Sequence, residues 1–213
     1  MIYLSVPYTC KRDGKAYTLP AFLNNPHITV LRTPIDYGPA TKLYGALMKH
    51  QDENCNIIFV DDDMVYGRGM VEEFDRVSTM HPDSALAFSG YTIGEHGTVK
   101  GKLRIAAQYL LLTSLRRIDT LQGVHGVLVK PSFFDLPSLM RQDIPRYLWL
   151  EDDTWIARNL AARNVKLLQV PRSYTTIHYS NWLPGALSEN ENAGCVNCGK
   201  GIEYFKGKWL SQR

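Results

Sequence analysis

Short apolar runs alternate with amphipathic segments along the first sixty residues of the chain. Ile2–Val6, His27–Leu31 and Asn56–Val60 are runs of strand length, and the last contains Ile, Ile, Phe and Val in succession, which is typical of a strand buried on both faces. Apolar residues recur at helical spacing in Ala40–His50, and a shorter helical stretch is predicted around Lys15–Leu23. This order predicts an α/β fold with a doubly wound, mainly parallel sheet and right-handed crossovers.

Later segments show the same two patterns. Helices are predicted over Met70–Met80 and Trp149–Asn164, and strands over Ala85–Tyr91, Gly123–Val129, Lys166–Val170 and Tyr174–His178. Ile105–Leu115 is strongly apolar, and periodicity does not distinguish a strand from a buried helix there. The tail after Trp182 is predicted to be rich in loops. The sequence contains no internal repeat, and its length predicts one domain over residues 1–213.

Three consecutive carboxylates, Asp61, Asp62 and Asp63, follow the third apolar run directly. Ligands of parallel sheets gather at the carboxyl ends of strands. In an extended chain the side chains alternate, so Asp61 and Asp63 would point one way and Asp62 the other. Carboxylates this close repel each other, and Mg²⁺ or Mn²⁺ is the usual cation that neutralises them while leaving positions for phosphate oxygens. The alternative is a solvated acidic turn before a helix.

The end of the preceding apolar run carries Asp36 and Lys42 around a turn with Gly38 and Pro39. Because neighbouring strand ends would lie side by side, Asp36 can hydrogen-bond a base or ribose, and Lys42 near a helix start can face a pyrophosphate. The alternative is a helix-entry turn with a solvated lysine. The acidic triplet nearby favours the binding site.

Pro7, Tyr8 and Thr9 close the first apolar run at the same predicted sheet edge. An aromatic ring there can stack on a nucleobase, and a hydroxyl can bond the polar edge of the base. Arg12 in the following loop can meet a phosphate. The alternatives are that Tyr8 packs in the core and that Arg12 is only solvated.

Glu151, Asp152 and Asp153 precede a predicted helix, so they would lie at the positive end of its dipole, which keeps at least one of them ionised. An ionised carboxylate in a cleft can accept a proton from an attacking hydroxyl or stabilise a cationic, sugar-like transition state. A plain N-cap needs only one acid. Three acids favour a further role, with Asp152 and Asp153 as candidate catalytic residues.

Two histidines have candidate roles. His178 lies where a late strand would return to the sheet edge, and imidazole is a good third ligand for Mn²⁺, with a satisfied structural histidine as the alternative. His125 and Gly126 belong to Gly123–Val129, whose glycines permit close approach of the backbone to a ligand. We predict that these two residues line an acceptor pocket.

Composition narrows the classes of function. The 213 residues are 45% hydrophobic and 21% charged, which is ordinary for a globular protein. A formal charge of +3 suits anionic ligands but falls short of a nucleic-acid footprint. No apolar run approaches the length of a membrane span, and Met1–Pro7 lacks the pattern of a signal peptide, so a cytoplasmic protein is expected.

The four cysteines give one recognisable pair. Cys195 and Cys198 form a CxxC flanked by glycines, whereas Cys10 and Cys55 are isolated. A zinc ribbon needs two such pairs. Two reduced thiols in a glycine-rich loop are therefore favoured over structural zinc or a redox pair.

Together these motifs resemble those of the GT-A glycosyltransferases, nucleotide-sugar-dependent enzymes in which a DxD motif follows a buried strand. Residues 7–9 resemble the first nucleotide loop of the family, 36–42 its second, 61–63 its DxD motif, 123–129 its acceptor-side strand and 151–153 its acidic catalytic motif. DxD alone is weakly specific, and the ordered set is much stronger. More closely, the chain resembles the small glycosyltransferase domain encoded by chlorella viruses and associated with capsid glycans.

The resemblance implies a GT-A fold with a nucleotide-binding half over about residues 1–92 and an acceptor and catalytic half over about 93–213. It implies transfer of a hexose or deoxyhexose from a UDP-sugar to a hydroxyl of a glycan or glycoprotein. Mn²⁺ or Mg²⁺ would bridge Asp63 and the pyrophosphate, Asp61 would contact the ribose or complete the metal shell, and Asp62 would lie among the residues that bind the nucleotide sugar. A viral protein of this kind would work in the host-cell cytoplasm, with further domains of a longer polypeptide as partners.

Three other functions use similar residues. In a phosphatase of the haloacid dehalogenase type the DxD follows the first strand, and a Thr is expected where Val65 stands. Sugar nucleotidyltransferases need a glycine-rich basic loop after the first strand, which Pro7–Lys11 does not provide. A non-catalytic nucleotide- or carbohydrate-binding domain stays open as the alternative, as do the donor sugar, the acceptor and the stereochemical outcome.

Overall fold

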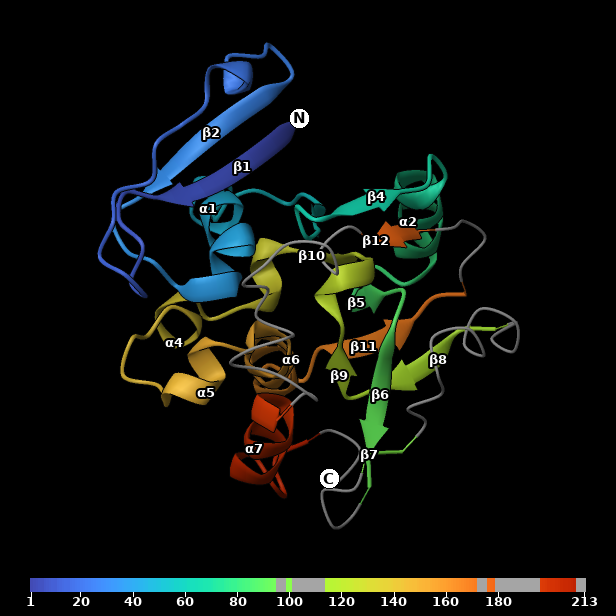
Figure 1. Ribbon diagram of the computed structural model, residues 1–213. Helices are drawn as coiled ribbons and strands as arrows, with labels where there is room; N and C mark the ends of the chain where they lie inside the picture. Colours follow the sequence, from blue (N-terminus) through green and yellow to red (C-terminus); the bar gives the residue numbers. More distant parts are fainter. Residues whose placement is uncertain (95–98, 101–113, 172–175, 179–195, 210–213) are drawn as a thin grey trace.

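Helices cover both faces of a five-stranded sheet in the computed structural model of the protein (Figure 1). The structure describes residues 1–94, 99–100, 114–171, 176–178 and 196–209. In spatial order the strands of this sheet are β3 (Ile57–Phe59), β10 (Val127–Val129), β5 (Ser84–Ala87), β11 (Lys166–Gln169) and β8 (Arg116–Ile118). The α-helices of the described residues are α1 (Thr41–Lys49), α2 (Met70–Met80), α4 (Leu136–Leu139), α5 (Arg146–Trp149), α6 (Asp152–Ala162) and α7 (Val196–Tyr204).

The five-stranded sheet is mixed and mostly antiparallel. β10 runs antiparallel to both of its neighbours, β3 and β5, and β8 runs antiparallel to β11, whereas β5 and β11 are parallel. The prediction of a mainly parallel, doubly wound sheet is therefore wrong for this sheet. β10 enters the sheet from the 3₁₀ turn Gly123–His125, which follows β9 (Thr120–Leu121) of a smaller sheet.

The first two strands form a separate parallel pair. β1 (Ile2–Pro7) and β2 (Ile28–Thr33) pair along their whole length, and α1 packs against both of them and against β3 (Figure 1). The strands and the helix follow the predicted order, but β3 pairs with β10 instead of joining β1 and β2. Gly45 of α1 lies so close to Ser5 of β1 that an added Cβ would collide with the serine side chain.

Both faces of the central sheet are buried. Ala85 and Ala87 of β5 belong to the larger core cluster, together with Ile156 of α6, whereas Leu86 of the same strand packs in a second cluster with Phe74 of α2. All five side chains are fully buried. For the run Asn56–Val60, a strand buried on both faces was predicted, and β3 agrees: Ile57 and Phe59 are buried in the larger cluster, and Ile58 is partly buried against the second.

Two smaller sheets flank the central one. β4 (Met64–Tyr66) pairs antiparallel with β12 (Thr176–His178), and β6 (Gly90–Ile93) pairs antiparallel with β7 (Val99–Lys100) and β9. The strand predicted over residues 85–91 is thus divided between β5 and β6. Residues 172–175, which include the start of the predicted strand over 174–178, lie outside the described structure.

Three predicted helices agree with the structure and one does not. The helix predicted over Trp149–Asn164 is present as α6, with narrower bounds. The helix over Met70–Met80 is confirmed without change as α2, and the helix over Ala40–His50 is confirmed as α1. The helical stretch predicted around Lys15–Leu23 is wrong, because the structure has only the 3₁₀ turn Ala21–Leu23 there. It follows directly after Pro20, and proline in a helix interior removes a hydrogen bond and clashes with the preceding turn.

The end of the chain carries a helix that the sequence did not predict. Cys198 and Ile202 of α7 are buried, and so is Trp209 after it. The prediction of a loop-rich tail is wrong for this segment, because its apolar residues belong to the main core. The Cys198 thiol is hydrogen-bonded to the Tyr91 hydroxyl at 2.5 Å. Residues 179–195, with Cys195 among them, lie outside the described residues, as does 105–113 of the apolar run at 105–115.

A membrane-spanning helix is not found in the part of the chain that the structure describes. None of its helices combines the length and the apolar character that crossing a bilayer requires.

Candidate functional site

Lys42 lies at the centre of a cluster of carboxylates from distant parts of the chain. It stands in the first turn of α1, and its Nζ is 2.6 Å from Asp61 Oδ1 and 3.1 Å from Asp152 Oδ2. Asp61 follows β3, and Asp152 is the first residue of α6. The side chains of Lys42, Asp61 and Asp152 are 19%, 27% and 9% exposed, so salt screens these ion pairs less than it would on the open surface.

Asp153 and Gly123 complete this Lys42 cluster. The backbone N–H of Gly123 donates to Asp153 Oδ1 at 2.9 Å. A Cβ at position 123 would lie 3.0 Å from both Asp153 Oδ1 and Lys42 Nζ, so a larger residue would press on two charged groups. Glycine at this position permits a close approach of its backbone to the Asp153 carboxylate and the Lys42 ammonium group. Its predicted approach to a ligand stays a prediction.

The charges of the cluster change the proton affinity of its members. Burial disfavours the ammonium form of Lys42, but attraction to Asp152, Asp61 and Asp153 outweighs burial and raises the pKa of Lys42 well above its usual value. Burial, together with repulsion by Asp152, raises the pKa of Asp153 well above that of an ordinary aspartate. The cluster therefore combines a firmly charged lysine with an aspartate whose pKa is raised.

Glu151 serves as the N-cap of α6. Its carboxylate accepts a hydrogen bond from the backbone N–H of Thr154 at 3.2 Å, and the residue is only 7% exposed. Burial, followed by repulsion from Cys198, raises the pKa of Glu151 to about 8. Because Glu151 takes the capping role, Asp152 and Asp153 in the first turn are left to interact with Lys42 and Gly123.

The acidic triplet lies in a turn. β3 ends at Phe59, Asp62 and Asp63 belong to a turn, and β4 begins at Met64. The extended geometry from which the alternation of Asp61, Asp62 and Asp63 was predicted is wrong, because the chain turns between the two strands. Exposure still differs as expected, since Asp62 is exposed and its two neighbours are partly buried.

Asp63 offers a carboxylate oxygen without a donor. Its Oδ1 is buried and makes no hydrogen bond to the described residues. Leaving a buried acceptor unsatisfied costs free energy, and a hard divalent cation would satisfy this oxygen. Asp61 and Asp63 therefore fit Mn²⁺ or Mg²⁺ chemically. The side chains described near the triplet do not by themselves form a group of three close ligands.

His178 is placed by its backbone beside the acidic triplet. In the antiparallel pair of β12 and β4, His178 is the partner of Met64, the residue after Asp63. The late strand was expected at the edge of the main sheet, but β12 instead pairs with β4 in a separate two-stranded sheet next to the triplet. The side chain of His178 lies outside the described structure, so its role as a metal ligand stays a prediction.

Tyr66 is a residue of the site that the sequence analysis missed. Its hydroxyl accepts a hydrogen bond from the backbone N–H of Asp61 at 3.0 Å and donates to the carbonyl of Val124 at 3.1 Å. Burial raises the pKa of Tyr66, which keeps the hydroxyl neutral. Tyr66 thus links the acidic turn with the segment that contains Gly123. A tyrosine in a short strand gives no sequence signal for such a contact.

Asp36 joins the two predicted nucleotide loops. Its Oδ2 accepts from the backbone N–H of Lys11 at 2.8 Å, and its Oδ1 accepts from that of Gly38 at 2.7 Å. The indole N–H of Trp149 donates to the Asp36 carbonyl at 3.3 Å. Asp36, Tyr37 and Trp149 also line a pocket. The carboxylate of Asp36 therefore organises the wall of this pocket, and its contact with a base or ribose stays a prediction.

The end of β1 lies against Arg32. The Pro7 carbonyl accepts from Arg32 Nη2 at 3.0 Å, and the Arg32 guanidinium lies 4.7 Å from the centre of the Tyr8 ring. Tyr8 is 55% exposed, so it is not a core residue, and Thr9 and Arg12 are exposed as well. Among the described residues, no hydrogen bond or ion pair joins Tyr8, Thr9 or Arg12 to the Lys42 cluster.

His125 ends the 3₁₀ turn, and Gly126 links this turn to β10. His125 is 5% exposed. Gly126 has φ of +94°, a conformation that residues with a side chain rarely adopt, and an added Cβ would lie 3.2 Å from Met70 Sδ. Burial of His125 limits its direct contact with an acceptor in this conformation, and the acceptor role of both residues stays a prediction.

The structure thus brings four of the predicted site residues together with Gly123 in one cluster: Lys42, Asp61, Asp152 and Asp153. A scan against models of protein families found no match, and a search of curated proteins found no similar protein. Inference about function therefore starts from this geometry.

Proposed function

We propose that the chain is a metal-dependent glycosyltransferase that uses a UDP-sugar as donor. The observation that carries the proposal is the convergence of Lys42 with Asp61, Asp152 and Asp153 at the end of β3. A carboxyl group whose pKa is strongly raised beside a specific charge partner marks a candidate functional site. A lysine among several carboxylates also suits the binding of a diphosphate together with a divalent metal ion. The lysine can contact a phosphate oxygen, and the carboxylates can hold the metal.

Donor binding uses the residues around the acidic turn. Lys42 would exchange its carboxylate partners for an oxygen of the diphosphate, and Asp61 and Asp63 would hold Mn²⁺ or Mg²⁺. When bound, the cation supplies Lewis acidity for the negative charge that develops on the departing UDP. The exposed Asp62 and the pocket beside Asp36 are the proposed further contacts of the nucleotide sugar.

The chemical step is assigned to Asp152 or Asp153. The raised pKa of Asp153 makes its carboxylate a stronger base than that of an exposed aspartate, because base strength increases with the pKa of the conjugate acid. The N–H of Gly123 orients one oxygen of Asp153. In an inverting transfer, the carboxylate takes the proton of the acceptor hydroxyl while the hydroxyl oxygen bonds to the anomeric carbon. The bond between that carbon and UDP breaks, and UDP leaves with its electrons.

The ordered motifs support a finer proposal. Their resemblance to the GT-A glycosyltransferases, and to the small domain encoded by chlorella viruses, favours transfer of a hexose or deoxyhexose to a glycan or glycoprotein in capsid glycan synthesis. The mostly antiparallel five-stranded sheet does not follow a clear GT-A pattern, so the proposal rests on the site. The host-cell cytoplasm would be the place of action, with further domains of a longer polypeptide as partners.

The test is the release of UDP from a panel of UDP-hexoses and UDP-deoxyhexoses with Mn²⁺, with and without glycan acceptors. We expect turnover by the wild type, its loss in Asp152→Asn or in Asp153→Asn, and its retention in the control Asp83→Asn, which changes an exposed aspartate next to β5. Metal-dependent binding of UDP without turnover of any donor would favour the non-catalytic binding domain. The absence of both binding and turnover would reject the proposed site.

A further inference from the structure

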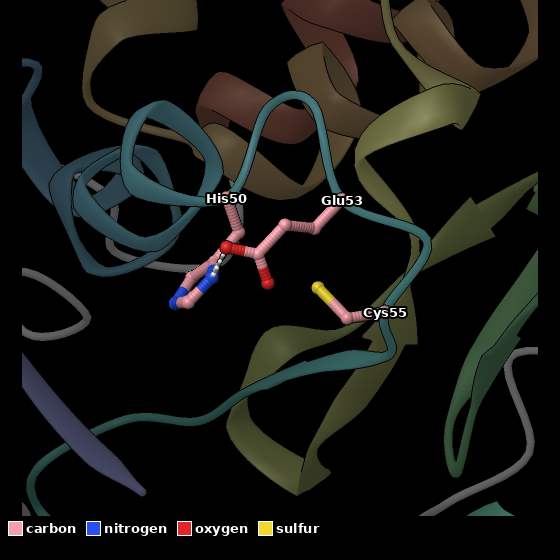
Figure 2. A group of neighbouring side chains, drawn as sticks. All are labelled: His50, Glu53 and Cys55. Carbon is pink, nitrogen blue, oxygen red and sulfur yellow. Dashed lines mark ion pairs between the residues drawn. The ribbon is translucent and has the colours of Figure 1, made fainter.

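A second group of potential metal ligands lies at the opposite ends of α1 and β3. His50 directly follows α1, Cys55 stands two residues before β3, and Glu53 lies in the loop between them. One ligand atom of each residue lies within 4.8 Å of the other two. Figure 2 shows the Glu53 carboxylate between the imidazole of His50 and the sulfur of Cys55. Lys42 and His50 stand at the two ends of α1, and the rise of a helix over this distance in sequence separates the two sites by about 12 Å.

The imidazole of His50 is held in a position that suits a metal ligand. Its Nε2 is hydrogen-bonded to the Tyr3 hydroxyl at 3.0 Å, and the two rings are in contact, with centroids 5.3 Å apart. A hydrogen bond to the nitrogen that does not bind the metal is the usual way in which proteins orient a ligating histidine. Tyr3 lies in β1, so this contact comes from a neighbouring element.

The other ring nitrogen of His50 faces the group without a hydrogen bond. Nδ1 is buried and lies 3.0 Å from Glu53 Oε1, but within the described structure the geometry of a hydrogen bond is not met. A buried nitrogen in this state is costly. A cation placed between Nδ1, the carboxylate and the Cys55 sulfur would satisfy all three.

We propose that His50 Nδ1, the Glu53 carboxylate and the Cys55 thiolate bind a zinc ion, with water in the fourth position. Imidazole, carboxylate and thiolate are the ligand types that Zn²⁺ takes in tetrahedral sites. At the usual bond lengths, ligand atoms around tetrahedral zinc lie about 3.3–3.8 Å apart. The observed 3.0 Å between Nδ1 and Oε1, and the limit of 4.8 Å for the group, bracket this range, so small side-chain movements complete the site.

The zinc site would have a structural effect. On binding, the Cys55 thiol loses its proton to solvent and the sulfur becomes the zinc ligand. The ion joins the end of α1 to the start of β3 and, through His50 and Tyr3, to β1. It would stabilise the folded chain according to its affinity, because the unfolded chain lacks the assembled site. It shares no residue with the proposed donor site, so either proposal can fail alone.

The experiment measures metal binding to the full chain after treatment with a chelator. Co²⁺ is titrated first, because a cobalt–thiolate bond has a characteristic absorption, and Zn²⁺ is then added in competition while thermal unfolding is followed. We expect one equivalent of thiolate-bound metal and a rise in Tm for the wild type and for Cys10→Ser. This control changes another free and partly buried cysteine.

Variants of the ligands decide the outcome. Cys55→Ser should lose the thiolate signal, and Glu53→Gln should weaken zinc binding by at least about tenfold. Glu53 is 60% exposed, so its variant keeps the proposal testable if Cys55→Ser fails to fold. An unchanged thiolate signal in Cys55→Ser would assign the metal to other cysteines and overturn the site. Unchanged zinc affinity in Glu53→Gln, or wild-type protein that binds no metal through a thiolate, would do the same.

Discussion

The two ends of α1 and β3 carry clusters of different construction. At one end, Lys42 balances Asp61 and Asp152, which come from segments far apart in sequence. At the other end, His50, Glu53 and Cys55 come from one short loop, and His50 Nδ1 lacks a hydrogen bond in the described structure. In the first cluster the cation is the ammonium group of Lys42, which must leave its carboxylate partners to contact a ligand. The second is a ligand set that an added cation would complete.

The largest expected effect is on catalysis at the Lys42 cluster. Asp152→Asn and Asp153→Asn remove the candidate bases while keeping the shape of the side chains, and we expect donor turnover to fall by about 10²–10⁴-fold for the residue that acts as the base. UDP affinity should change little, because the acidic turn is intact. Rates of UDP release with saturating donor measure this. Full turnover in both variants would show that the chemistry does not use α6.

The next effect is on stability. Lys42→Met leaves Asp61 and Asp152 without their shared cation, and we expect a loss of about 2–4 kcal/mol in the free energy of unfolding, because an unpaired, partly buried charge is costly. Urea unfolding measures the loss. Lys206→Met is the matched control, since the Lys206–Glu203 pair is 49% and 65% exposed and should contribute less than about 1 kcal/mol. Equal losses in the two variants would contradict a special role for Lys42.

A third effect is the pH dependence that Glu151 causes. Its pKa is about 8 in the folded protein against an ordinary value of 4.5, so the folded state binds more protons than the unfolded state between these values. The contribution of Glu151 to the free energy of unfolding therefore falls as pH rises through this window, by at most about 1.4 kcal/mol per pH unit. Glu151→Gln should flatten the decline in urea unfolding at pH 5, 7 and 8.5. A slope equal to that of the wild type would contradict the raised pKa.

The smallest effect is expected at the loop before β3. Without added metal, Glu53→Gln breaks only a half-exposed contact with His50, so the free energy of unfolding should change by less than about 1 kcal/mol. Urea unfolding in the presence of a chelator measures this. A large loss under these conditions would mean that the Glu53 carboxylate already stabilises the loop without a metal ion. It would contradict the claim that the group needs an added cation.

Periodicity predicted the elements better than their pairing. The helical spacing of apolar residues correctly predicted both ends of α2, and the apolar run before Asp61 correctly predicted the position of β3. An apolar run has no direction, however, so the antiparallel placement of β10 between β3 and β5 could not be predicted from Val127–Val129. Long-range pairing depends on the connection and on packing, which periodicity does not describe.

The contrast between the two clusters shows the same limit for sites. Lys42, Asp61, Asp152 and Asp153 were predicted because charged residues follow apolar runs or begin a helix. The group around His50 was missed, because the histidine ended a predicted helix and Cys55 was an isolated cysteine, so no spacing rule joined them. Their proximity depends on how the loop folds back between α1 and β3.

The most direct test of the central claim is the binding of UDP to the wild type and to Asp63→Ala, followed by thermal shift with and without Mn²⁺. We expect UDP to raise the Tm of the wild type only when Mn²⁺ is present, because ligand binding stabilises the folded state. Asp63→Ala removes the buried oxygen that lacks a donor, and UDP should then raise the Tm little or not at all. An equal UDP-dependent rise in both proteins with Mn²⁺ would contradict the claim.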